Sequence, residues 1–95
     1  MESVTVFACE AQPIVVEGLR CIFSACQDLR LVGQAADPAE ALRGIARLTP
    51  RLVLLGDFYP AKPLLPLSLQ IREQFPGTSV ILWMMDFSDA DRLRA

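Results

Sequence analysis

The alternation of two kinds of segment along the chain constrains its fold more than any other feature of the sequence. Short runs of β-branched and other apolar residues, typical of buried strands, are separated by stretches with apolar side chains at helical spacing. Such an alternation predicts right-handed crossovers that build a parallel sheet with helices on both faces. The four strand-like runs are Val4–Cys9, Leu29–Ala35, Leu52–Leu55 and Ser79–Met84.

The first two helical stretches have clear start signals. Pro13 suits the first turn of a helix that extends to Phe23. Its predicted buried residues are Val15, Leu19, Ile22 and Phe23. In the second stretch Asp37 predicts an N-cap, Pro38 takes the first helical position, and Glu40 can reach back to the backbone N–H of the cap. The buried face predicted for this helix consists of Ala41, Leu42, Ile45, Ala46 and Leu48.

The third and fourth helical stretches are weaker. Pro66 must lie in the first turn of a helix that extends to Phe75 and ends before Pro76 and Gly77. The apolar side of this helix is predicted to carry Leu67, Ile71 and Phe75. The segment Asp86–Leu93 is typical of a helix opening, because acidic residues favour the positive end of the helix dipole.

Length and composition indicate one small globular domain spanning 1–95. Of its 95 residues, 53% are apolar and 21% are charged, which is enough to build a core. A net charge of −2 with scattered basic residues argues against direct binding to nucleic acid. The apolar run Ser79–Met85 is far shorter than the roughly 20 residues that a membrane span requires. Because Glu2 is acidic and no basic flank precedes the first apolar run, we expect a cytoplasmic protein without a secretory signal.

The three cysteines, Cys9, Cys21 and Cys26, form no CxxC pair, and the sequence contains no histidine. Zinc sites in proteins are usually built from such pairs together with histidines. We therefore expect no metal site and predict reduced thiols that pack as small apolar groups.

Several segments, in order and spacing, resemble the receiver domains of NarL/LuxR-type two-component response regulators. They are Gln12–Leu19, Val32–Asp37, Pro50–Leu55, Pro60 and Glu73–Thr78. The resemblance implies the α/β, flavodoxin-like receiver fold with strand order 2-1-3-4, the fifth strand and the last helix being absent. It also implies an incomplete receiver-like domain over 1–95 with no output domain.

The functional residues that the resemblance implies are mostly replaced. Receiver domains place two adjacent acids after the first strand to hold Mg²⁺, where this sequence has Glu10 and Ala11. The phosphoacceptor aspartate should follow Leu55, but Gly56 stands there and Asp57 comes one residue late. The hydroxyl residue expected at the end of the fourth strand is Met84, and the expected lysine would lie beyond Ala95.

These losses act together, because a carboxylate accepts a phosphoryl group only when a divalent cation and a lysine neutralise the charge that is transferred. A single carboxylate rarely holds Mg²⁺. We therefore predict no catalytic residue, no cofactor and no enzyme activity, and we interpret Glu10 as an exposed acid at a strand end. The predicted function is that of a phosphorylation-independent receiver-like domain of a transcriptional response regulator, acting by dimerisation or partner binding.

The alternative is a phosphoacceptor that uses Asp57 with Glu10 and Mg²⁺. A shift of one residue turns a strand side chain to the opposite face, so this alternative requires a bulge at Gly56. A further hypothesis is that a small molecule enters the space left by Cys9, Ala11 and Gly56.

The expected partner surface is the fourth strand. Without a fifth strand it is an edge that no charge or proline protects. Its residues are Val80, Ile81, Leu82 and Trp83. A second copy could pair with it, an element could be exchanged between two copies, or a signalling protein could add a strand. A chain shortened from a longer regulator is another explanation, and Phe58 and Tyr59 are secondary interface candidates.

Overall fold

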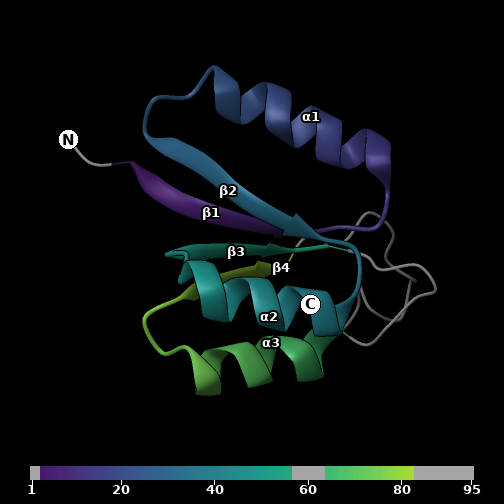
Figure 1. Cartoon of the computed structure of the whole chain (residues 1–95), viewed down its shortest axis with the longest axis vertical. Coiled ribbons are helices and arrows are strands. Elements are labelled where there is room, and N and C mark those ends of the chain that lie inside the picture. The colour runs from purple at the N-terminus through teal and green to yellow at the C-terminus, as the bar shows by residue number, and fades with distance from the viewer. Residues whose placement is uncertain (1–2, 57–63, 83–95) are drawn as a thin grey trace, which may run out of the picture.

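The computed structural model describes residues 3–56 and 64–82, and these form a single parallel sheet with helices on both faces (Figure 1). Strands and helices alternate without exception along the described chain. The elements are β1 (Val4–Cys9), α1 (Pro13–Ser24), β2 (Leu29–Ala35), α2 (Pro38–Leu48), β3 (Leu52–Leu55), α3 (Leu64–Gln74) and β4 (Ser79–Leu82). The strand order is β2-β1-β3-β4, which confirms the predicted topology.

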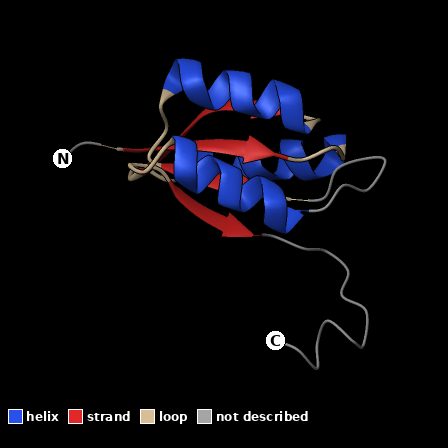
Figure 2. Ribbon diagram, turned by 90° about the horizontal axis from the view of Figure 1, so that it is seen from below, coloured by secondary structure: helices blue, strands red, loops and turns tan. Residues whose placement is uncertain are grey.

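The helices form two layers, one on each side of the sheet. Helix α1 covers one face, and α2 and α3 lie side by side on the other (Figures 1 and 2). This distribution follows from the strand order: the crossover from β1 to β2 goes one way along the sheet, while those leading to β3 and β4 go the other way. Right-handed crossovers in opposite directions place their helices on opposite faces.

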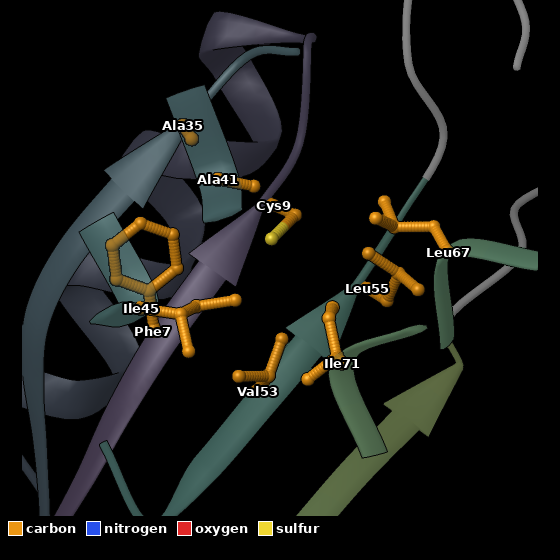
Figure 3. Packing of buried hydrophobic residues seen from close by; sticks show 9 residues of the cluster. All are labelled: Phe7, Cys9, Ala35, Ala41, Ile45, Val53, Leu55, Leu67 and Ile71. Atoms are coloured by element: carbon orange, nitrogen blue, oxygen red, sulfur yellow. The ribbon is translucent and has the colours of Figure 1, made fainter. Parts of the chain in front are cut away.

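The main core lies between the sheet and the α2–α3 layer (Figure 3). Alternate residues of β1 and β3 point into it and meet the apolar faces of the two helices, as expected for strands covered on both sides. Its buried members are Phe7, Cys9, Ala35, Ala41, Ile45, Val53, Leu55, Leu67 and Ile71. The same strand alternation directs Val6 and Ala8, which are also buried, toward the α1 side.

The Phe7 ring fills space that two glycines leave open. A Cβ at Gly33 of β2 would lie 2.8 Å from the ring, and a Cβ at Gly44 of α2 would lie 2.6 Å from it. Such distances are too short for carbon atoms, so both positions are restricted to glycine by close approach. These two glycines therefore allow α2 to lie near the β1–β2 part of the sheet.

The ends of α2 agree closely with the sequence signals. The Asp37 side chain accepts a hydrogen bond from the Glu40 N–H at 2.9 Å, as an N-cap should. The Glu40 carboxylate accepts from the N–H of Ala36, at 3.2 Å, and not from the predicted N–H of Asp37. The helix ends at Thr49, whose φ of 43° places it in the left-handed region.

Most of the predicted helix faces are confirmed, with two exceptions. Leu67 and Ile71 are buried and Phe75 is half-buried, as the spacing in α3 predicts, and Pro66 lies in the first turn of that helix. In contrast, Ile22 of α1 is 62% exposed and Ala46 of α2 is exposed, although both were predicted to be buried. Both residues lie at the margins of their apolar faces, beyond the reach of the sheet.

The predicted fourth helix and the end of the fourth strand, Trp83 and Met84, lie outside the described residues. Among the helices that the structure describes, none has the length and hydrophobicity that crossing a membrane would need.

Candidate functional site

The ends of β1 and β3 meet at the carboxyl edge of the sheet, where sites form in folds of this kind. Cys9 pairs with Leu55 in the parallel ladder, and the N–H of Gly56 donates to the carbonyl oxygen of Cys9 at 2.7 Å. Glu10 and Gly56 are therefore neighbours across the two strands. Asp57, the shifted acceptor of the alternative hypothesis, and Met84 lie outside the described residues.

Glu10 is buried, so its interpretation as an exposed acid was wrong. Only 5% of the residue is exposed to solvent. Its carboxylate Oε1 accepts a hydrogen bond from the backbone N–H of Gln12 at 3.1 Å. Gln12 is the N-cap of α1, so the carboxylate lies near the positive end of the helix dipole. The turn from β1 into α1 therefore gives this acid a favourable site out of solvent.

Gly56 has no room for a side chain, because the Glu10 carboxylate lies directly over it. A Cβ at Gly56 would overlap Glu10 Oε2, and it would lie 3.1 Å from the carbonyl oxygen of Cys9. The cavity that remains at the α1 side of these strand ends measures about 10 Å³, roughly the volume that one water occupies. Directly over Gly56 the described residues therefore leave too little space for a small molecule. Ala11, another residue of that hypothesis, lines a larger hollow beside it.

Among the described residues, the ends of β1 and β3 offer Mg²⁺ a single carboxylate, because Asp57, the second acid of the alternative hypothesis, lies outside them. Glu10 brings a single carboxylate, of which one oxygen is already bonded to the N–H of Gln12. Mg²⁺ binds in a near-octahedral arrangement of oxygen ligands and is usually held by more than one acidic group. Within 3–56 and 64–82 no cluster of three or more His, Cys, Asp or Glu side chains could hold a metal ion.

A second hollow, of about 240 Å³, lies between the start of α1 and the end of β2. Three carboxylates, those of Glu10, Glu17 and Glu40, line it. The sequence pattern did not group these acids, because Glu17 of α1 and Glu40 of α2 come from helices on opposite faces of the sheet and share only this hollow at the strand ends. Glu40 is already used in the capping interaction with the N–H of Ala36, which leaves this hollow as a polar surface feature.

The three cysteines are free, as predicted, but they differ in environment. Cys9 is buried in the core, and burial raises the pKa of its thiol from 9.0 to about 12. Cys26 is half-buried, whereas Cys21 is exposed and does not pack as an apolar group. The prediction of a packed thiol therefore holds for Cys9 and is wrong for Cys21.

Strand β4 forms one edge of the sheet in the part of the chain that the structure describes. Val80 packs against the core, whereas Ile81 and Leu82 are 50% and 43% exposed. The opposite edge, β2, carries the charged Arg30. The register of its pairing with β1 also shifts, at the step from Val6 to Phe7 of β1. Charges and bulges discourage edge pairing, so β4 is the less protected of the two edges.

Comparison with known proteins places the chain in a class. The fold closely matches receiver domains of response regulators, and the chain is a receiver-like domain with four of the strands in the flavodoxin-like order. The receiver domain of the putative response regulator NarL from Mycobacterium tuberculosis gives a TM-score of 0.82 at 27% identity, over 95% of this chain and 73% of that one. The isolated receiver domain of RcsB from Salmonella enterica serovar Typhimurium gives 0.81 at 18% identity, over 97% and 69%.

A curated relative, the uncharacterised transcriptional regulatory protein YhcZ of Bacillus subtilis, is 34% identical over 80 residues. That match covers 84% of this chain and 37% of the relative, so the chain spans little more than a third of the relative's length. No family model matches the sequence.

Proposed function

We propose that this chain is the receiver-like domain of a transcriptional response regulator and that it acts by dimerisation or partner binding, without phosphorylation. The observation that carries this proposal is the state of the acceptor position. Gly56 stands where receiver domains place the phosphoacceptor, and the Glu10 carboxylate covers it. Glycine has no nucleophile, and a covering carboxylate repels an incoming phosphoryl group.

The same residues favour a protein that is not an enzyme and needs no cofactor. Phosphoryl transfer depends on a cation and on positive side chains that neutralise the charge on the phosphoryl group. The strand ends described here instead carry one buried carboxylate whose Oε1 is bonded to the chain itself. The relatives of the chain are response regulators and a transcriptional regulatory protein, in keeping with a signalling role in the cytoplasm.

The proposed partner surface is the outer edge of β4, from Val80 through Ile81 and Leu82 to Trp83, the last of which lies outside the described residues. A homodimer, formed by edge pairing or by exchange of an element, is the simplest assembly, and a signalling protein is the other type of partner. One solved relative, RcsB, is described as dimers bound to DNA. The net charge of −2 favours a role for this chain in assembly and not in DNA contact.

The test is to incubate the protein with acetyl phosphate or beryllofluoride in the presence of Mg²⁺ and to measure intact mass and a two-dimensional NMR spectrum. We expect an unchanged mass and an unchanged spectrum. A phosphoryl adduct at Asp57, or Mg²⁺-dependent shifts at Glu10 and Gly56, would overturn the proposal in favour of a phosphoacceptor that uses Asp57 with Glu10 and Mg²⁺.

A further inference from the structure

Two residues at the former phosphorylation site touch each other in the structure. One is Glu10, the acid that remains after β1, and the other is Gly56, which stands at the acceptor position without a side chain. The Glu10 carboxylate occupies the space that a side chain at position 56 would need. The two residues therefore complement each other: the glycine makes room and the glutamate fills it.

We propose that Glu10 is a built-in occupant of the vacated acceptor position, which fixes the carboxyl edge of the sheet in one arrangement. This inference rests on the proposed function, because it explains how a receiver-like domain holds its switch region without phosphorylation. The position that would receive a negative group in an active receiver contains here the carboxyl group of Glu10 from the neighbouring strand.

The hydrogen bonds around Glu10 show what this occupant connects. Its backbone N–H donates to the carbonyl oxygen of Ala35, at the end of β2, at 2.9 Å. Its Oε1 accepts from the N–H of Gln12, at the start of α1. The Oε2 side of the carboxylate lies against Gly56, whose own N–H donates to Cys9. The residue thus joins the ends of three strands and the first turn of α1.

The contact with Gly56 depends on the length of the side chain at position 10. A glutamate or a glutamine reaches over the glycine, whereas an aspartate is one methylene shorter and leaves room for a methyl group. No glycine among the described residues has a positive φ, so alanine at position 56 meets no backbone strain. Any penalty for Gly56→Ala must therefore come from contacts, chiefly with Glu10.

The experiment measures the effect of Gly56→Ala on the unfolding equilibrium in three backgrounds, by urea denaturation of the full chain. The backgrounds are the unmodified protein, Glu10→Gln, which keeps the length but removes the charge, and Glu10→Asp, which keeps the charge but shortens the side chain. Gly77→Ala is the matched control, because a Cβ at Gly77 would meet nothing within 4 Å. That control measures the intrinsic effect of a glycine-to-alanine change in a non-helical position.

Relative to the control, we expect Gly56→Ala to raise the unfolding equilibrium constant roughly tenfold to a hundredfold in the unmodified and Glu10→Gln backgrounds, because overpacking destabilises the folded state. In the Glu10→Asp background the increase should shrink to about threefold or less, the part that Cys9 imposes. If the single variant Gly56→Ala does not fold, folding of the double variant with Glu10→Asp supports the inference. Equal losses of stability in all three backgrounds, no loss of stability in the unmodified protein, or a double variant that also does not fold would overturn it.

The two proposals fail in different ways. A phosphoryl adduct at Asp57 would overturn the phosphorylation-independent function, whatever the coupling between positions 10 and 56. If the coupling between positions 10 and 56 is absent, the inference about Glu10 fails. An unchanged mass after incubation with acetyl phosphate would then still support the proposed function. Intact mass and urea denaturation therefore separate the two conclusions.

Discussion

Replacing Leu82 with proline tests directly whether the outer edge of β4 pairs two copies of the chain. The N–H of Ser79 donates to the carbonyl oxygen of Arg51, at the entry to β3, at 2.9 Å. Successive residues of a strand direct their N–H groups to opposite sides, so Ile81 also faces β3, whereas Val80 and Leu82 face outward. Proline at position 82 therefore removes a donor from the free edge and leaves the β3–β4 ladder in place.

The magnitude follows from the number of outward N–H groups. Each copy offers those of Val80 and Leu82, so a two-fold antiparallel pairing forms about four N–H···O bonds between the edges. Leu82→Pro deletes one donor in each copy and removes two of these bonds. At about 0.5–1.5 kcal/mol per bond, dimerisation weakens by about 1–3 kcal/mol, and the dimer Kd rises roughly fivefold to 150-fold.

The assay is sedimentation equilibrium over a range of protein concentrations, with the unfolding free energy measured in parallel. Ile81→Pro is the matched control, because it removes a donor that faces β3 and should destabilise the monomer by about 1 kcal/mol or more. A dimer Kd that Leu82→Pro leaves unchanged would refute edge pairing. A wild-type protein that stays monomeric near 1 mM would refute the dimer itself.

The remaining predictions concern stability. Gly44→Ala should lower the unfolding free energy by about 1–3 kcal/mol, because its Cβ would meet the Phe7 ring at 2.6 Å. Gly18→Ala, in an open stretch of α1, should raise it by about 0.5–1 kcal/mol, and urea denaturation measures both effects. Asp37→Ala should cost about 1 kcal/mol, while Asp37→Ser should retain most of the N-cap, as thermal unfolding will test. Because burial raises the pKa of Cys9 from 9.0 to about 12, its contribution to stability is complete below pH 9. Above pH 9 the contribution should fall by about 1.4 kcal/mol per pH unit as the unfolded thiol ionises, with a shallower slope in Cys9→Ala.

The fold was predictable because its main signals are local. Apolar runs and helical spacing identify the elements, and the right-handed crossover rule leaves few ways to order them in one sheet. The cap at Asp37 is equally local, since its partner, Glu40, is three residues away. The structure confirms both features. The order of the segments and the chemistry of the helix cap therefore predict most of the architecture of this chain.

The environment of Glu10 was not predictable from the same signals. An isolated acid at a strand end is usually exposed, but here the chain turns so that the N–H of Gln12 faces the carboxylate. The space over Gly56 depends on the pairing of β1 with β3, whose partner residues are 46 positions apart in sequence. A usable signal would have been the combination of a glycine at one strand end with a longer acid at the end of the adjacent strand.

The exposed side of α1 shows a different limit of sequence patterns. Helical spacing identifies an apolar face, but it does not say how much of that face the sheet reaches. Val15 and Leu19 line a small cavity together with Leu54 of β3, and Ile22 follows them one turn further along the same side of the helix. Ile22 is nevertheless 62% exposed, because the buried face of α1 is centred on Val16 and Leu19. The apolar face of α1 is therefore wider than the part of the sheet that it covers, and a prediction of burial from spacing alone fails at its margin.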